Sequence, residues 1–273
     1  MARYACLVIG DPVEHSLSPV LHDAGYEALG LKEWKYAAQR VLPEALPAFA
    51  ANLRRSDDVR GVSVTMPHKE AIMSLLDELD GPAALIGAVN TIVPDGGRLR
   101  GYNTDWLGVL EALRPVCNLS GERVAVIGAG GAARAFVYGL VQAGAKVTVY
   151  NRTPGKAEEL ARRFDCAVGE LGDAAAIREA GVVCNTTSVG MGDGPASPVP
   201  EGALRAGQVV FDAVYNPYET KLLRDAAAVG ATVVHGTEML LHQAAAQFRL
   251  FTGRAAPVEQ MRAAMMKVVL EKL

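Results

Sequence analysis

The clearest hydrophobic pattern in the chain lies around residue 130, where two short apolar runs flank a glycine-rich turn. Residues 123–127 read Arg-Val-Ala-Val-Ile and predict a buried parallel strand, because such strands are apolar on both faces. The turn 128–133 follows, then a helix-competent stretch over 134–143 and a second strand over 146–150. Strand, glycine turn, helix and strand within about 30 residues form the context in which such a turn indicates dinucleotide binding.

Each small residue in this turn has a predicted physical role. Gly128 permits the tight turn, Gly130 lets the backbone approach a pyrophosphate, and Ala133 lets helix and strand pack closely. The free amides and the positive dipole at the helix start then face the phosphates. Glycine also serves tight strand-to-helix turns for geometry alone, but the surrounding elements favour the nucleotide site. The predicted cradle comprises Gly128, Ala129, Gly130, Gly131 and Ala132.

The end of the second strand indicates which dinucleotide binds. NAD-binding domains usually place an acidic residue there to accept the ribose hydroxyls. Here the strand is followed by Asn151, Arg152 and Thr153, with Lys156 close behind and no carboxylate until Glu158. A guanidinium suits a 2′-phosphate, although a solvated arginine at a strand end is the simpler alternative. Charge type and position together favour NADP.

The rest of the chain predicts a second α/β unit before the turn and further strands after it. Ser18 followed by Pro19 predicts a helix cap and first turn. The predicted strands are 5–9, 34–38, 62–64, 182–185, 209–214 and 231–235. The predicted helices are 18–29, 43–54 and 69–79, a helix from Thr104-Asp105 to near Arg114, and two amphipathic helices in 238–273, broken near Gly253 and Pro257. A hairpin is predicted from 88–93 and 99–102 around Pro94-Asp95-Gly96-Gly97-Arg98.

Composition excludes several classes of protein. The 273 residues are 50% hydrophobic, which is enough for two domains with buried cores. A net charge of -3 without a basic block predicts no nucleic-acid partner, and no apolar run approaches the roughly 20 residues of a membrane span. The four cysteines (6, 117, 166 and 184) lack CxxC spacing, so we expect neither disulfides nor a metal site. A soluble cytoplasmic enzyme acting on a small molecule fits best.

Several motifs resemble those of the shikimate dehydrogenases, in family order and at familiar separations. The segments that carry the resemblance are Ser16-Leu17-Ser18-Pro19, Val64-Thr65-Met66-Pro67-His68-Lys69, Ala88-Val89-Asn90-Thr91, Gly101-Tyr102-Asn103-Thr104-Asp105, 128–135, Asn151-Arg152-Thr153, 212–220 and 236–243. The resemblance implies reversible NADPH-dependent reduction of 3-dehydroshikimate to shikimate in aromatic biosynthesis. It also implies a substrate domain with a mostly parallel mixed sheet over residues 1–105, completed by helices in 237–273, and a Rossmann-type NADP domain over 106–236. A monomer or a homodimer is expected.

The same resemblance implies a catalytic pair, Lys69 and Asp105. An ammonium near the substrate carbonyl can stabilise developing negative charge and supply a proton, and a carboxylate can orient that ammonium. Without the resemblance, Lys69 reads as a solvated lysine at a helix start and Asp105 as a helix cap.

Further site residues are implied in the same way. Ser16 and Ser18 hold the substrate carboxylate, although Ser18 could act only as a cap. The residues expected around the ring hydroxyls are Thr65, Asn90 and Gln243, with Tyr215 at the edge of the site. The expected cofactor contacts beyond the cradle and Arg152 are Thr186, Gly236 and Met239. For Asn90, Gln243, Tyr215 and Met239 the alternatives are turn stabilisation, helix capping, half-buried packing and core filling.

Two departures from the family pattern concern the substrate motif and the glycine turn. The usual asparagine two positions before Thr65 is Ser63, and a frequent serine in the turn is Ala133. Three alternatives to NADP-dependent action on shikimate remain. They are a quinate/shikimate dehydrogenase that uses NAD, a paralogue acting on aminated analogues, and a non-catalytic regulator that senses metabolites. Arg152 disfavours the first, and the presence of both Lys69 and Asp105 disfavours the last.

Overall fold

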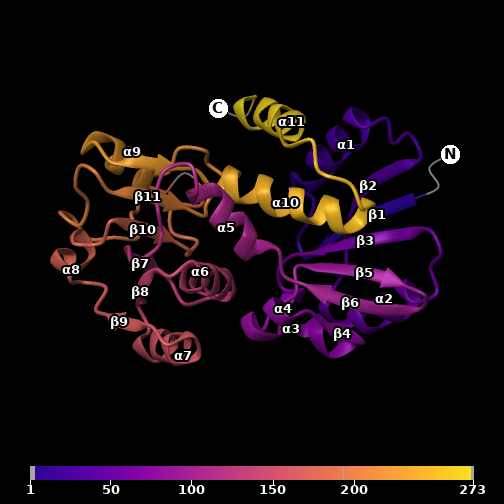
Figure 1. Ribbon diagram of the computed structural model, residues 1–273, viewed down its shortest axis with the longest axis horizontal. Helices are drawn as coiled ribbons and strands as arrows, with labels where there is room; N and C mark the ends of the chain where they lie inside the picture. The colour runs from indigo at the N-terminus through magenta and orange to yellow at the C-terminus, as the bar shows by residue number, and fades with distance from the viewer. Residues whose placement is uncertain (1–3, 193, 272–273) are drawn as a thin grey trace. The chain divides into compact units, whose positions relative to one another are not determined.

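The computed structural model describes residues 4–192 and 194–271, which form two compact α/β units (Figure 1). The first unit extends to Thr104 and resumes at Leu241, whereas the second is the continuous segment Asp105–Leu240. Helix α10 (Gly236–Thr252) therefore begins in the second unit and ends in the first. The first unit is discontinuous in sequence and needs both ends of the chain.

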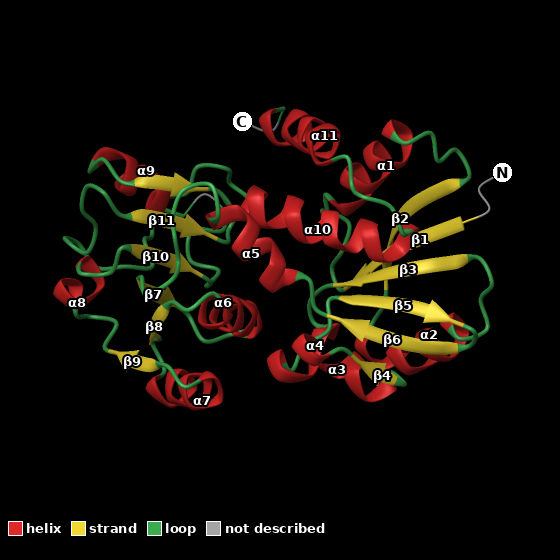
Figure 2. Cartoon of the chain, viewed as in Figure 1, coloured by secondary structure: helices red, strands yellow, loops and turns green. Residues whose placement is uncertain are grey.

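The first unit is built on a six-stranded mixed sheet with strand order β2-β1-β3-β5-β6-β4 (Figure 2). Three neighbouring pairs are parallel, and only β5 runs antiparallel to its neighbours, β3 and β6. The strands are β1 (Tyr4–Gly10), β2 (Trp34–Arg40), β3 (Val59–Val64), β4 (Glu78–Leu79), β5 (Thr91–Asp95) and β6 (Arg98–Tyr102). The helices are α1 (Ser18–Ala28), α2 (Leu46–Leu53), α3 (His68–Ala71), α4 (Gly81–Ile86) and α11 (Val258–Leu270), with the later part of α10.

The predicted hairpin is present between β5 and β6. Asp95 pairs with Arg98 across a two-residue turn, in which Gly96 and Gly97 have φ of 54° and 83°. Two consecutive positive φ values match the tight turns that suit the strand twist and favour glycine.

Two local predictions in the first unit were wrong. The helix expected over 69–79 is a short helix followed by a 3₁₀ turn and strand β4, because the backbone amides of Asp77 and Asp80 donate to carbonyls on β6. Ser18 is not the cap of α1: Leu17 occupies that position, and Ser18 is the first helical residue. The Ser16 hydroxyl instead accepts from the Ser18 amide at 3.3 Å, which satisfies a donor that the helix start leaves unpaired.

The second unit is an all-parallel sheet of order β12-β11-β10-β7-β8-β9. Counted from β7, its strands stand in the order 3-2-1-4-5-6 of a Rossmann-type domain, which confirms the predicted fold class. The strands are β7 (Arg123–Ile127), β8 (Lys146–Tyr150), β9 (Ala167–Gly169), β10 (Val182–Asn185), β11 (Val209–Asp212) and β12 (Thr232–Val234). The helices are α5 (Asp105–Leu113), α6 (Gly131–Gln142), α7 (Pro154–Phe164), α8 (Ala174–Arg178) and α9 (Lys221–Ala228).

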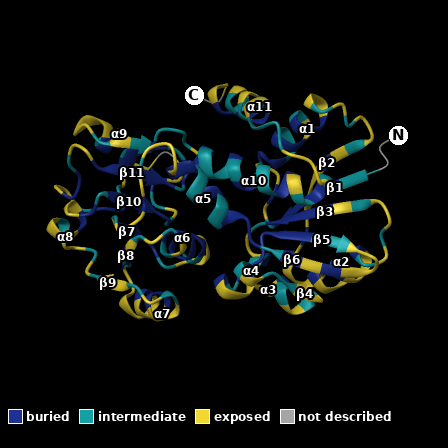
Figure 3. Cartoon of the chain, in the orientation of Figure 1, coloured by how far each residue is buried: buried dark blue, intermediate teal, exposed yellow. Residues whose placement is uncertain are grey.

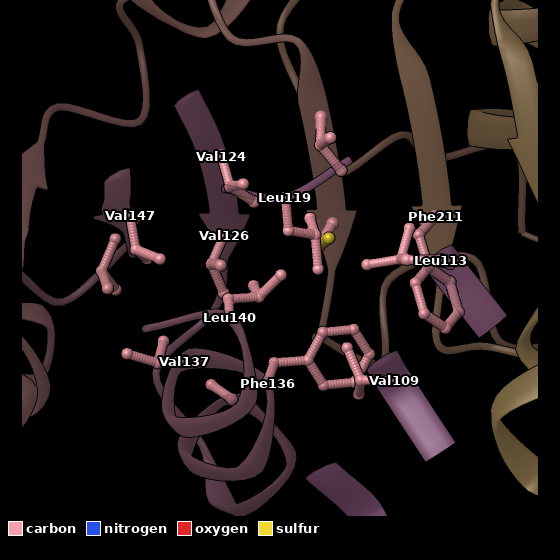
Figure 4. Packing of buried hydrophobic residues seen from close by; sticks show 14 of the residues in the cluster. Val109, Leu113, Leu119, Val124, Val126, Phe136, Val137, Leu140, Val147 and Phe211 are labelled. Atoms are coloured by element: carbon pink, nitrogen blue, oxygen red, sulfur yellow. The ribbon is translucent and has the colours of Figure 1, made fainter. Parts of the chain in front are cut away.

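The core of the second unit lies on both faces of this sheet, and its central strands are buried (Figure 3). On one face, Val124 and Val126 of β7 pack against Phe136 and Leu140 of α6 (Figure 4). Ala125 and Ile127 alternate onto the opposite face. This packing fixes the carboxyl end of β7, where the glycine turn begins.

Candidate functional site

The glycine turn of the second unit has the geometry that its sequence predicts. Gly128 has a φ of 114°, and a Cβ there would lie 2.5 Å from the Thr186 hydroxyl oxygen, so only glycine fits. At Gly130 and Gly131 a Cβ would meet no atom within 4 Å. The amides at the start of α6 therefore border open space that a pyrophosphate could fill. Ala133 is fully buried in the core, as close packing of helix and strand requires.

Thr186, expected to contact the cofactor, supports the turn from the neighbouring strand. Its buried hydroxyl donates a 2.8 Å hydrogen bond to the Ile127 carbonyl, and its amide donates to the same oxygen. The Thr186 side chain thus holds the carboxyl ends of β7 and β10 together, beside Gly128.

A buried polar network, not identified from the sequence, fixes the adjacent loops. Asp212 at the end of β11 accepts hydrogen bonds from Asn185 at 2.8 Å, Thr220 at 2.6 Å and the Val214 amide at 3.0 Å. Burial raises the pKa of Asp212, while these donors oppose the increase. The network positions the loop that carries Tyr215, whose pKa is raised by burial. The sequence signal for this network was a polar residue at the end of each of two buried strands, Asn185 and Asp212.

The end of β8 opens onto a cavity of about 820 Å³. Asn151 and Arg152 line it together with Leu171 and residues 197–200, while Thr153 and Lys156 are not among its lining residues. Arg152 is exposed, and the Asn151 amide nitrogen donates to the Thr153 carbonyl at 2.9 Å. Glu158 also lines the cavity. Its size and the guanidinium suit an adenosine that carries a 2′-phosphate.

The start of α10 lies against the end of β11. A Cβ at Gly236 would lie 2.7 Å from the Ala213 carbonyl oxygen, so this approach requires glycine. Met239 packs against the core of the second unit, which supports its core-filling role.

In the first unit, hydrogen bonds connect Asn90 and its neighbour to the segment bearing Lys69 and to Thr104. The Val89 amide donates to the Lys69 carbonyl at 2.8 Å, which joins the segment bearing Lys69 to the residue before Asn90. The Asn90 side-chain oxygen accepts from the Thr104 amide at 2.8 Å, and its nitrogen donates to the Thr104 hydroxyl at 2.9 Å. Asn90 therefore fixes the residue that directly precedes Asp105.

Asp105 is the first residue of α5 in the second unit. A carboxylate at this position is favoured by the helix dipole, so the cap-like role and the catalytic role are compatible. The turn interpretation of Asn90 is likewise compatible with its predicted contact to substrate.

The remaining substrate residues lie at element ends and on α10. Thr65 follows β3, and its amide donates to the Ile9 carbonyl at 2.9 Å. Gln243 lies inside α10, which excludes the helix-cap interpretation. Gln247, one turn further on, was missed: it is 2% exposed and bonded to Ser63. The signal was a second glutamine four residues after Gln243, which places both on one face of the helix.

A Rossmann-type sheet with an open glycine turn, and an arginine beside a cavity after its second strand, is the architecture of a dinucleotide-dependent dehydrogenase. The chain belongs to the shikimate dehydrogenase family. Residues 8–92 match the shikimate dehydrogenase substrate binding domain, residues 111–190 match shikimate / quinate 5-dehydrogenase, and residues 236–266 match the shikimate 5'-dehydrogenase C-terminal domain. The family predicted from the motifs is confirmed.

Similar proteins match over nearly the whole chain. Shikimate dehydrogenase (NADP(+)) of Methanothermobacter thermautotrophicus is 43% identical over 96% of this chain and 95% of its own length. That of Halobacterium salinarum is 46% identical over 94% of this chain and 97% of its own. A structure of shikimate 5-dehydrogenase from Thermus thermophilus, in complex with NADP(H) and shikimate, has a TM-score of 0.91 and 42% identity, covering 97% of this chain and 99% of that chain.

The described part of the chain contains neither a cluster of potential metal ligands nor a membrane-spanning helix. Over residues 4–192 and 194–271, no group of three or more histidine, cysteine or acidic side chains could hold a metal ion. No helix in the same ranges combines the length and apolar character of a membrane span. The four cysteines are free, and burial raises the pKa of Cys6 to about 12.

Proposed function

We propose that this protein is an NADP-dependent shikimate dehydrogenase, which interconverts 3-dehydroshikimate and shikimate in aromatic amino acid biosynthesis. The observation that carries the proposal is identity of 43–46% to enzymes of this name over more than nine-tenths of the chain. The open glycine turn and the cavity at Arg152 fit the cofactor.

The second unit would hold the cofactor at three points. The amides of residues 128–132 would bind the pyrophosphate at the start of α6, and Arg152 would pair with the 2′-phosphate, helped by Asn151, Thr153 and Lys156. Thr186, Gly236 and Met239 would complete the nicotinamide end. When bound, NADPH supplies the hydride for C3 of the substrate.

The first unit would bind the substrate. Ser16 and Ser18 would donate hydrogen bonds to its carboxylate, whereas Thr65, Asn90 and Gln243 would contact its ring hydroxyls, with Tyr215 at the edge of the site. Lys69 would donate a proton to the C3 oxygen as that oxygen gains negative charge, and Asp105 would orient the ammonium and help to move the proton. In the oxidative direction Lys69 would accept that proton.

The test is a spectrophotometric assay of purified protein with shikimate and quinate, each with NADP and with NAD. We expect kcat/KM to be highest for shikimate with NADP. Comparable rates with quinate and NAD would overturn the assignment, and reaction only with an aminated analogue would indicate the paralogue. We also propose a cytoplasmic location, tested by cell fractionation, and a monomer or homodimer, distinguished by sedimentation equilibrium.

A further inference from the structure

A buried chain of hydrogen bonds crosses the first unit from β2 to the start of β5. The Tyr36 hydroxyl donates to the Ser63 hydroxyl at 2.6 Å, and Ser63 donates to the Gln247 side-chain oxygen at 2.8 Å. The Gln247 nitrogen donates to the Asn90 carbonyl at 3.0 Å and to the Thr91 hydroxyl at 2.9 Å. We call Tyr36, Ser63 and Gln247 the relay, and each is at most 5% exposed.

The relay ends on Asn90 in two ways. Besides the bond to the Asn90 carbonyl, the Thr91 hydroxyl donates to the Asn90 side-chain oxygen at 2.7 Å. Gln247 thus fixes both the backbone and, through Thr91, the side-chain amide of Asn90. The Ser63 hydroxyl has one hydrogen and donates it to Gln247, so toward Tyr36 it can only accept. The bonds therefore run in one direction, from Tyr36 through Ser63 to Gln247.

At its other end the relay reaches α1, the helix that begins at Ser18. The Tyr36 amide donates to the Asp23 carboxylate on α1 at 3.0 Å. Burial raises the pKa of Tyr36, and its hydrogen bond to Ser63 opposes this increase. The ring itself is held by face-to-face stacking on His22, with centroids 4.3 Å apart.

We propose that Tyr36 is a positioning residue for the substrate: through Ser63 and Gln247 it fixes the orientation of Asn90, and through its amide bond to Asp23 it ties the relay to α1. Tyr36 touches no reacting atom in this scheme. The inference rests on the proposed function, because it takes shikimate as the ligand of Ser18 and Asn90.

The relay also gives Ser63 a role. Its hydroxyl is short enough to lie between the Tyr36 hydroxyl and the Gln247 side chain, both of which are buried. A longer amide at position 63 would have to displace one of these partners. Ser63 therefore acts through Asn90 rather than by a contact of its own with the ring hydroxyls.

The test compares Tyr36→Phe with Tyr26→Phe in the full-length protein. Tyr36→Phe keeps the ring and its stacking but removes the first donor of the relay, and we expect the KM for shikimate to rise about 3- to 10-fold, the value of one neutral hydrogen bond. We expect kcat to change less than about twofold and the KM for NADP to stay constant. Tyr26→Phe removes a hydroxyl from the same aromatic cluster outside the relay and should leave all three constants unchanged.

A double-mutant cycle separates the relay from general packing. Ser63→Ala should raise the KM for shikimate as Tyr36→Phe does, and the double variant should match either single variant, since both break one chain of bonds. Additive losses, an unchanged KM in folded Tyr36→Phe, or equal changes in both KM values would overturn the inference. Absence of wild-type activity with shikimate would instead overturn the proposed function.

Discussion

His22 provides a direct test of how burial in the first unit controls stability. Its imidazole is fully buried on α1 among the rings of Tyr36, Tyr26, Phe248 and Phe251. Desolvation by burial lowers the pKa of His22 from 6.5 to about 3. The folded state therefore keeps His22 neutral at pH values at which the unfolded chain binds a proton.

The sign and size of the effect follow from this difference in pKa. Below the unfolded pKa of 6.5, unfolding takes up a proton at His22, so stability falls as pH falls and stops falling only near the folded pKa of about 3. Between about pH 7.5 and about pH 5.5 the loss from this one group is about 1.4 kcal/mol. The loss of stability in this window does not depend on the exact pKa of His22 in the folded state, because both pH values lie well above that pKa.

The assay is urea unfolding of wild type and His22→Phe at these two pH values. The protein has two tryptophans, Trp34 in the first unit and Trp106 in the second, so a Trp106→Phe background makes fluorescence report on the first unit. His22→Phe keeps an aromatic ring and removes the titration. We expect the variant to lose about 1.4 kcal/mol less than wild type between the two pH values. Equal pH dependence in both proteins would refute the reasoning, because every other titrating group is common to both.

Three further predictions concern the proposed reaction. Lys69→Ala should lower kcat about 100- to 10,000-fold with little change in KM for shikimate. In the double variant with Asp105→Asn, the loss of kcat should be smaller than the product of the two single losses. Steady-state kinetics in which Lys69→Ala raised KM alone would contradict this assignment. Ser16→Ala should raise the KM for shikimate about 10- to 150-fold and leave that for NADP unchanged, since it removes one bond to a charged carboxylate. An unchanged KM for shikimate in the folded variant would leave Ser16 only its local bond at the start of α1. Arg152→Ala should weaken NADP binding about 10- to 150-fold, less at high salt, and leave NAD binding nearly constant; calorimetric titration showing equal losses for both cofactors would rule out a role at the 2′-phosphate.

The sequence predicted the elements that are determined locally. The apolar runs at 123–127 and 146–150 became β7 and β8, and the glycines between them fixed the turn, because strand burial and a positive φ leave a clear pattern. The prediction of a helix over 69–79 was wrong because the pairing of β4 with β6 outweighs the helical spacing of the leucines in this segment. The prediction that Ser18 caps α1 was wrong because serine and proline also suit the first helical turn.

The relay could not be predicted from the pattern. Ser63 and Gln247 are separated by 184 positions, and no local rule brings a strand serine and a helix glutamine together. The same holds for Asp212, whose partners come from β10 and from the start of α9. Only the fold shows that these polar residues satisfy one another in the interior.

The discontinuity of the first unit has a consequence for the order of events during synthesis on the ribosome. Residues of the second unit form one continuous segment and can close their sheet as soon as they emerge. The first unit cannot do so: Phe251 of α10 lies directly against Gly61 on β3, and Gln247 supplies the acceptor for Ser63. The strands made first keep an uncovered apolar face and an unpaired hydroxyl until the last helices leave the exit tunnel. The amino-terminal segment up to Thr104 is thus exposed to aggregation for as long as translation of the other unit takes.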